Sequence, residues 1–214
     1  MFQAHSSLQH FASLERLTSK RIFDVTAAGL GIFLFAPVAT TIAGLIFLED
    51  QGDIFFTQER AGHSRHPFKV LKFRSMQDGQ VTRVGRWLRG TGLDELPQFI
   101  NVLRGEMSIV GPRPLTQADI VRLGWDKSEY DARWVLPPGM TGLAQLGGQG
   151  YAASSYQLDL LYLHHSSFTL DCKLVLLSCA ANLLGKKRIK QFVTRQEYIS
   201  DGKLSNFLRN LLRL

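Results

Sequence analysis

The sequence predicts an α+β fold, in which an N-terminal re-entrant membrane helix-break-helix precedes a small helix-rich domain with a short β-sheet and interfacial amphipathic helices. Three observations carry this prediction. Residues 25–48 contain no charged side chain, and this stretch exceeds the ~20 residues that cross the hydrocarbon core of a bilayer. Two short runs, 54–57 and 68–74, have the length and composition of strands. After residue 80, apolar residues recur mostly at helical spacing.

The composition is that of a folded protein with polyanionic partners. The chain has 214 residues, of which 25 are Lys or Arg and 18 are Asp or Glu, and its net charge is +7. This charge favours nucleic acid, anionic lipid or phosphorylated substrates. No standard nucleic-acid-binding signature accompanies it, so we expect no nucleic-acid partner. The two cysteines, Cys172 and Cys179, form no CxxC pair, which argues against a disulfide framework or a structural zinc site.

The uncharged stretch starts too late and is too long for a cleavable signal peptide, so we expect it to stay in the mature protein. Near its centre, Pro37 lacks a backbone N–H and clashes with the carbonyl of Phe33. Ala36 is pushed away from helical geometry, and the hydroxyls of Thr40 and Thr41 could bind the carbonyls that are freed. The stretch is therefore either a kinked helix that spans the bilayer or a hairpin that breaks at Ala36-Pro37.

The segment after this stretch alternates short strands with turns. Phe68 and Val70 share one face with Lys72, so neither face is purely apolar and a small, partly exposed sheet is expected. Residues 80–90 predict a short basic helix. A further helical stripe has apolar residues three and four apart, at Leu93, Leu96, Ile100 and Leu103.

Two later segments are expected to lie at a membrane surface. The helix at about 170–184 is apolar, but Asp171 and Lys173 make it a poor candidate to span a bilayer. It ends in a basic run at 186–190, and residues 207–213 alternate apolar and basic side chains. Such segments bind anionic phospholipid through their apolar area and their charge.

The densest chemical signal is LDELPQ at residues 93–98. Because a helix tolerates proline only in its first turn, Pro97 places Asp94 and Glu95 at or near a helix N-terminus. The helix dipole there favours ionised carboxylates and can receive phosphate. An ionised Asp94 can attack phosphorus, and Glu95 suits Mg²⁺, which takes one or two carboxylates together with substrate phosphate oxygens. The alternative is a solvated capping pair.

Basic residues weigh against simple capping. They are Arg89 upstream, the guanidinium of Pro112-Arg113-Pro114 between two rigid residues, and Lys72 and Arg74 on the predicted strand. Arginine offers paired donors to phosphate, and a pyrophosphate would need several such groups. Each of these cations alone would be interpreted as surface charge.

A series of ordered motifs resembles the monotopic polyprenol-phosphate phosphoglycosyl transferases, the bacterial sugar transferases. The motifs are KRIFD at 20–24, FTQERAG at 56–62, FKVLKFRSM at 68–76, LDELPQ at 93–98, GPRP at 111–114, PGMTGLAQ at 138–145 and LDLLY at 158–162. They cover most of the chain, and their shared order is far more specific than any one of them.

The resemblance implies a two-step reaction. Asp94 would attack the sugar-bearing phosphorus of a UDP-sugar, release UMP and hold the phosphosugar as a covalent ester, which polyprenol (undecaprenyl) phosphate then attacks. Glu95 would bind Mg²⁺, and Arg89 and Arg113 would clamp phosphate. The remaining candidate substrate-binding residues are Lys72, Arg74, Pro112, Pro114 and Gln145. Such enzymes initiate bacterial glycan or exopolysaccharide synthesis at the cytoplasmic face of the inner membrane.

The implied substrates also favour one topology. Lys20 and Arg21 precede the uncharged stretch and should remain cytoplasmic, so a spanning helix would place the rest of the chain away from UDP-sugars. We therefore divide the chain into an N-terminal arm (1–19), a re-entrant membrane anchor (20–49), a catalytic domain (50–190) and a C-terminal amphipathic tail (191–214).

The chain also departs from the family pattern. Ala36-Pro37 stands where Ser-Pro is common, Asp53 where proline is frequent, and Gly90 and Gly92 where bulkier residues are usual. The sugar stays open, although residues 140–155 are candidate determinants. A non-catalytic basic membrane adaptor is the competing hypothesis, but it leaves the Asp94-Glu95 pair and Arg113 unexplained.

Overall fold

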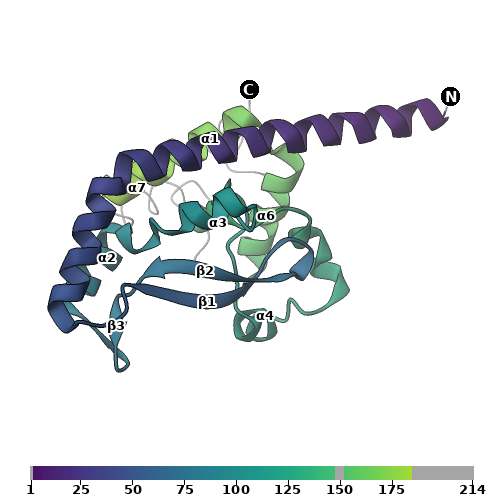
Figure 1. Cartoon of the computed structure of the whole chain (residues 1–214). Coiled ribbons are helices and arrows are strands. Elements are labelled where there is room, and N and C mark those ends of the chain that lie inside the picture. Colours follow the sequence, from purple (N-terminus) through teal and green to yellow (C-terminus); the bar gives the residue numbers. More distant parts are fainter. Residues whose placement is uncertain (1, 148–151, 185–214) are drawn as a thin grey trace.

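The computed structural model describes residues 2–147 and 152–184, and it has the α+β architecture that the sequence predicts (Figure 1). The predicted tail at 191–214 and the basic run at 186–190 lie outside the described residues. In chain order the elements are α1 Phe2–Asp50, β1 Phe55–Ala61, η1 His63–Arg65, β2 Pro67–Phe73, β3 Met76–Gln77, β4 Gln80–Val81, α2 Arg83–Thr91, η2 Leu93–Glu95, α3 Gln98–Arg104, β5 Ser108–Val110, α4 Gln117–Leu123, η3 Ser128–Val135, β6 Gly139–Thr141, α5 Leu143–Gly147, α6 Ala152–His165 and α7 Phe168–Leu184.

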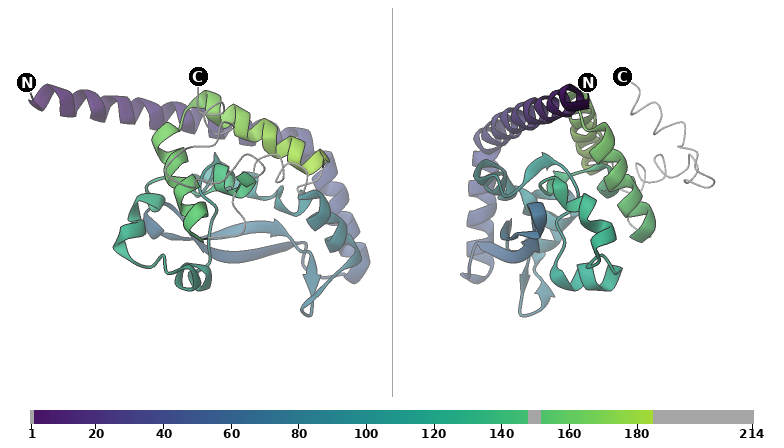
Figure 2. Two further views of the ribbon diagram at one scale, coloured as in Figure 1. Left: turned by 180° about the vertical axis from the view of Figure 1, so that it is seen from behind. Right: turned by 90° about the vertical axis from the view of Figure 1, so that its right-hand side faces the viewer.

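The helix α1 is continuous but bent. Its helical assignment runs through Ala36 and Pro37, so the expected break is a bend within one helix, and the views in Figures 1 and 2 both show the change of direction. The hydroxyl of Thr40 donates to the carbonyl of Ala36 at 2.9 Å, and that of Thr41 donates to the carbonyl of Pro37 at 2.9 Å. Proline and such threonine bonds to the preceding turn both bend helices without ending them.

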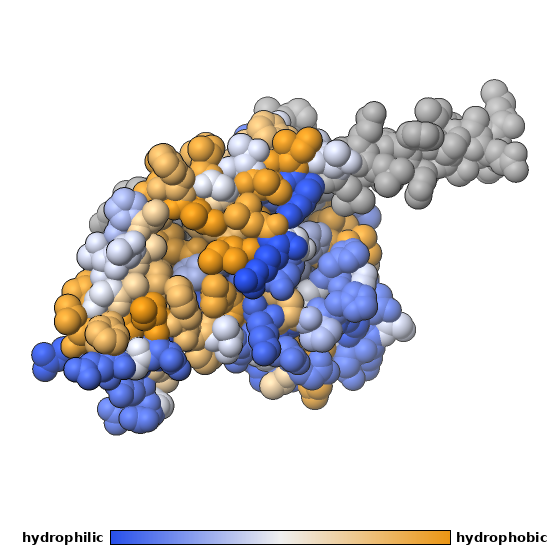
Figure 3. Space-filling view, in the orientation of Figure 1, coloured by the Kyte–Doolittle hydropathy of each residue, from blue (hydrophilic) through white to orange (hydrophobic). Residues whose placement is uncertain are grey.

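The middle of α1 is an exposed apolar surface. Within Thr18–Asp50, an 18-residue stretch has a mean hydropathy of 2.2 and is 17% buried, and by length and composition this helix could cross a membrane. Phe33 and Leu48 are each 78% exposed. Figure 3 shows apolar side chains gathered on the α1 side of this face, whereas hydrophilic side chains cover the opposite end near α4. This helix is therefore not the buried core helix of a globular domain.

Both ends of this apolar stretch pack on the same domain. At the start, Asp24 is 3% exposed and its Oδ1 accepts from Ser108 Oγ and from Ile109 N–H, both at 2.9 Å. At the end, Ile42 and Ile46 are buried in one cluster with Leu88 of α2. The anchor and the domain are thus held together at two separate places.

The lysine and arginine that flank the stretch are part of this packing. Lys20 Nζ lies 2.8 Å from Asp171 Oδ2 of α7 and donates to the hydroxyl of Tyr162 at 3.1 Å. Arg21 donates to the carbonyls of Val102 and Leu103 at 2.6 and 2.8 Å. These carbonyls lie in the last turn of α3, where a cation interacts favourably with the C-terminal end of a helix.

The sheets are small, as predicted. β1 and β2 pair antiparallel from Phe55↔Phe73 to Ala61↔Pro67, and β5 pairs in parallel with β6. Val70 and Phe73 of β2 are 1% and 3% exposed, whereas Phe55 of β1 is 49% exposed, so β2 is the more buried of the two strands. The main core lies between the ribbon formed by β1 and β2 and the helices, and its most buried members include Val102, Val110, Tyr162 and Leu174.

Candidate functional site

A left-handed glycine places the two candidate carboxylates. Gly92 has φ 77° and closes α2 by donating its N–H to the carbonyl of Leu88 at 2.8 Å. Because this backbone conformation favours glycine, Gly92 allows the chain to turn sharply into η2, which contains Asp94 and Glu95. Pro97 is the N-cap of α3 rather than a member of its first turn. The two carboxylates therefore lie one short turn ahead of α3.

Asp94 is partly withdrawn from water. Burial raises the pKa of its carboxyl above the ordinary value, and repulsion by Glu95 raises it further, while Lys72 and Arg89 act in the opposite direction. The expected stabilisation of the ionised form is thus outweighed by desolvation. Arg89, whose Nε donates to Ser75 Oγ at 2.8 Å, is one of the two cations that favour the charged carboxylate.

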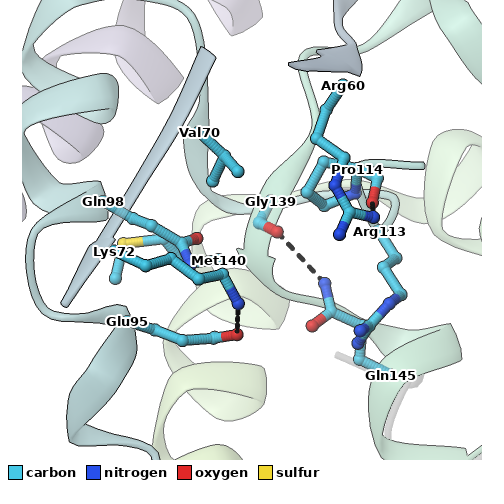
Figure 4. Close-up of a pocket in the computed structure, with 10 residues that line it drawn as sticks. All are labelled: Arg60, Val70, Lys72, Glu95, Gln98, Arg113, Pro114, Gly139, Met140 and Gln145. Atoms are coloured by element: carbon cyan, nitrogen blue, oxygen red, sulfur yellow. Dashed lines mark hydrogen bonds and ion pairs between the residues drawn. The ribbon is translucent and has the colours of Figure 1, made fainter. Parts of the chain in front are cut away.

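Glu95 faces a pocket between β2, α3 and the loops around residues 113 and 140. Its Oε1 accepts from Lys72 Nζ at 2.6 Å (Figure 4). The pocket has about 310 Å³ of empty space, part of which is open solvent. Its lining residues are Arg60, Val70, Lys72, Glu95, Gln98, Arg113, Pro114, Gly139, Met140 and Gln145.

Two guanidinium groups share one side of this pocket. Figure 4 shows Arg60 and Arg113 on the side away from Lys72 and Glu95. Burial lowers the pKa of Arg60, and the positive charge of Arg113 lowers it further. The Nε of Arg60 is buried without a hydrogen-bond partner among the described residues. Two cations that repel each other beside a cavity form a site that an anion would stabilise.

The backbone that carries Arg113 is held by three donors from other elements. The carbonyl of Pro112 accepts from Gly139 N–H at 2.8 Å, that of Arg113 accepts from Arg133 Nη2 at 2.6 Å, and that of Pro114 accepts from Arg60 Nη1 at 3.2 Å. A Cβ on Gly139 would lie 2.0 Å from the backbone nitrogen of Gly111, so this approach requires glycine. The loop is therefore rigidly placed against β6.

The sequence-predicted residues divide into two groups. Lys72, Glu95, Arg113, Pro114 and Gln145 meet in the pocket, where Gln145 Nε2 donates to the carbonyl of Gly139 at 3.1 Å. The other four predicted residues, Asp94, Arg89, Arg74 and Pro112, do not line it. Asp94 is near the pocket, because its carboxylate interacts with the charges of Lys72 and Arg89. Pro112 is buried.

Arg74 is placed away from the pocket. Its Nη1 lies 2.7 Å from Asp50 Oδ2, its Nη2 pairs with Asp50 Oδ1, and its Nε donates to the carbonyl of Asp53. This forked contact joins the end of β2 to the end of α1. The guanidinium has an intramolecular partner instead of a phosphate, because the chain reverses between α1 and β1 and brings Asp50 beside it.

Sequence reasoning gave no role to Arg60 and Gln98, although both belong to recognised motifs. Arg60 lies in FTQERAG, and Gln98 ends LDELPQ. Both are polar residues next to other motif residues, and this could have indicated them as site residues. That Arg60 and Gln98 meet in the pocket depends on how β1 and α3 pack.

The structure offers few ligands for a metal ion. Within residues 2–147 and 152–184, no three His, Cys, Asp or Glu side chains are grouped so as to hold one. Asp94 and Glu95 are nevertheless a donor set that fits Mg²⁺, which commonly takes one or two carboxylates and completes its shell with water and substrate phosphate.

The chain is similar to a known protein family and to several of its members. The family described as "Bacterial sugar transferase" matches residues 15–185. The undecaprenyl-phosphate glucose phosphotransferase of Komagataeibacter xylinus is 38% identical over 79% of this chain and 37% of its own length. The UDP-glucose:undecaprenyl-phosphate glucose-1-phosphate transferase of Caulobacter vibrioides is 41% identical over 73% of this chain and 67% of its own length. The UDP-N-acetylgalactosamine-undecaprenyl-phosphate N-acetylgalactosaminephosphotransferase of Aeromonas hydrophila is 37% identical over 78% of this chain and 44% of its own length.

The chain spans 37% of the Komagataeibacter protein but 98% of EpsL of Bacillus subtilis, which is described as an uncharacterized sugar transferase. The match contains the anchor, the carboxylate turn, the basic loop and the pocket. The protein therefore belongs to the bacterial sugar transferase family.

Proposed function

We propose that the protein is a phosphoglycosyl transferase that moves a sugar 1-phosphate from a UDP-sugar to undecaprenyl phosphate and releases UMP. The observation that carries this proposal is the pocket, in which Arg60, Lys72 and Arg113 face a single carboxylate, Glu95, beside Asp94. Cations in excess around a pocket suit a diphosphate ligand. The activities named for the relatives supply the substrate classes.

In the first step, one carboxylate oxygen of Asp94 attacks the sugar-bearing phosphorus. A bond between that oxygen and phosphorus forms, the phosphoanhydride bond breaks, and its electron pair leaves with UMP. Lys72 and Arg89 favour the ionised carboxylate that this attack requires. Arg60 and Arg113 are placed to compensate the negative charge of the departing phosphate.

In the second step, a phosphate oxygen of undecaprenyl phosphate attacks the same phosphorus. The aspartyl oxygen leaves with its electron pair, which regenerates the carboxylate and yields undecaprenyl diphosphate sugar. The acceptor is a lipid, so the pocket must open near the bilayer surface. The exposed apolar surface of α1, together with its packing against the domain, supports such a location.

Mg²⁺ would be held by Glu95, with Asp94 beside it. When bound, the ion would neutralise charge on the diphosphate oxygens. Lys72 Nζ lies 2.6 Å from Glu95 Oε1, so this lysine and the ion would share the carboxylate.

For the anchor, we infer a re-entrant topology at the cytoplasmic face of the bacterial inner membrane, with anionic phospholipid as the surface. A helix that spans the bilayer puts its two ends on opposite sides. Here Lys20 and Asp24, at one end, and Ile46 and Asp50, at the other, all contact the same polar domain. The bend in α1 allows both ends to remain on one side while the exposed middle enters the bilayer.

Labelling tests this topology. Cys172 and Cys179 are first replaced by alanine, and single cysteines are placed at residue 5 and within the 76–80 hairpin. We expect a membrane-impermeant reagent to label both positions from the same side of sealed vesicles. Labelling from opposite sides would rule out the hairpin and support a spanning helix.

A trapping experiment tests the reaction. The purified protein is incubated with Mg²⁺ and a panel of UDP-sugars without acceptor lipid, and the intact mass is measured. We expect UMP release and a phosphosugar adduct that maps to Asp94. If no UDP-sugar gives UMP or an adduct, the membrane-adaptor hypothesis is the better one.

A further inference from the structure

Gln98, the first residue of α3, lines the pocket with its side-chain amide. The residue is 3% exposed and lines the cavity. Among the described residues, its side-chain amide makes no hydrogen bond, and no interaction is drawn to it in Figure 4. Because the amide lines the pocket and has no partner in the protein, its donors and its acceptor remain available to a ligand.

A second amide in the same helix shows how a structural one is satisfied. Asn101 is 0% exposed, and its Oδ1 accepts from Leu71 N–H at 2.9 Å. Its Nδ2 donates to the carbonyl of Lys69 at 2.8 Å and to Glu106 Oε2 at 2.6 Å. One helical turn separates the two amides. Asn101 thus joins α3 to β2 through Leu71 and Lys69, whereas Gln98 makes no such bond, so its role is not to join the two elements.

The position of Gln98 indicates which part of a ligand it meets. It follows Asp94 and Glu95 closely in the chain, and Figure 4 shows it on the same side of the pocket as Lys72 and Glu95. The phosphorus attacked by Asp94 carries the sugar, whereas the uracil is separated from it by another phosphate and a ribose. The sugar is therefore the nearest uncharged part of the donor.

The chemistry of the side chain agrees with that position. The three cations of the pocket suit phosphate oxygens, which accept hydrogen bonds but do not donate them. A primary amide both donates and accepts, which matches a hydroxyl group. We propose that Gln98 hydrogen-bonds a hydroxyl of the transferred sugar and so contributes to sugar recognition. This proposal rests on the proposed function, because it takes the donor to be a UDP-sugar.

The test measures binding without turnover. Full-length protein carrying Asp94→Asn, in lipid nanodiscs, is titrated calorimetrically with UDP-glucose, UDP-galactose, UDP-N-acetylglucosamine, UDP-N-acetylgalactosamine and UMP. Gln98→Met is then added, because methionine fills a similar volume without the amide. We expect the tightest UDP-sugar to bind about three- to tenfold more weakly, as for one lost hydrogen bond. The affinity for UMP should change less than about twofold, since UMP lacks the sugar.

Two controls separate recognition from misfolding. Gln117→Met changes an exposed glutamine at the start of α4 and should leave both affinities unaltered. If Gln98→Met lowers the melting temperature, Gln98→Asn serves as a second variant, which keeps the amide but shortens it. It should also weaken UDP-sugar binding while UMP binding is preserved.

The remaining outcomes overturn the proposal. Equal loss of UDP-sugar and UMP affinity would assign Gln98 to the nucleotide or its phosphates. No loss of either would show that the amide contacts no part of the donor. Failure of the proposed function is a different result, namely that protein without substitutions releases no UMP, and it is measured in a separate assay.

Discussion

The pocket and the neighbouring aromatic cluster (Trp125, Tyr130, Trp134 and Tyr156) are both built around arginine, but they use it in opposite ways. Arg133 is 3% exposed, its Nε lies 2.7 Å from Asp159 Oδ2, and its guanidinium lies 5.1 and 4.7 Å from the ring centroids of Trp125 and Trp134. Arg113 is exposed and faces Arg60. An arginine with an internal carboxylate and aromatic faces stabilises the fold, whereas an arginine that faces another cation is placed for an external anion.

The two regions are also connected. Arg133 donates to the carbonyl of Arg113 at 2.6 Å, so the internally paired arginine positions the backbone of the pocket arginine. Substitutions in the cluster should therefore act first on stability, and substitutions in the pocket on activity.

The largest effect is expected at the carboxylate next to the pocket. Asp94→Asn should lower the rate of UMP release by roughly three orders of magnitude or more, because the amide is isosteric but is not a nucleophile. The control is Asp126→Asn, an exposed aspartate outside the pocket. Substantial turnover by Asp94→Asn would contradict the covalent role.

A large effect on stability is expected in the aromatic cluster. Asp159→Asn leaves the charge of Arg133 buried and unpaired, and it should lower the free energy of unfolding by about 3–5 kcal/mol. The matched control is Asp131→Asn, which removes the exposed partner of Arg65, a pair with an N–O distance of 2.8 Å. That change should cost less than about 1 kcal/mol. Similar melting temperatures for the two variants would remove the distinction between the cluster and the surface.

A smaller effect, on activity alone, is expected at the pocket arginine. Arg113→Lys should lower kcat/KM for the donor about tenfold, since an ammonium group cannot reproduce the forked contact with phosphate. The melting temperature should stay unchanged because the side chain is exposed. Arg122→Lys on α4, where the side chain is 71% exposed, is the control. Unaltered kinetics would show that Arg113 is surface charge.

The smallest effect concerns pH. The pKa of Asp94 is raised in the folded state, so the folded protein binds this proton more tightly, and the contribution of Asp94 to stability falls as pH rises through its folded pKa. Asp94→Asn should therefore unfold at a higher temperature than the unsubstituted protein at neutral pH. The gap should close on acidification toward the unfolded value of about 3.9. Thermal unfolding of both proteins across this range checks the sign, and a gap that widens on acidification would contradict it.

Much of this protein was predictable without tertiary structure. The uncharged stretch at 25–48, the short strands and the LDELPQ run each depend on neighbours in the chain. Local spacing therefore predicted the apolar helix, the small sheets and the position of Asp94 and Glu95 near the start of a helix. The order of the motifs was sufficient to predict the family.

The convergence of side chains was decided by packing. Lys72 and Arg74 are two residues apart at the end of β2, yet Lys72 pairs with Glu95 whereas Arg74 pairs with Asp50. Arg60 and Gln98 join the pocket from elements far apart in sequence. The partners of Arg133 and of both ends of α1 also lie outside the local sequence. Pairings of this kind depend on how whole helices and strands are placed in three dimensions. The spacing of residues along the sequence does not give this placement.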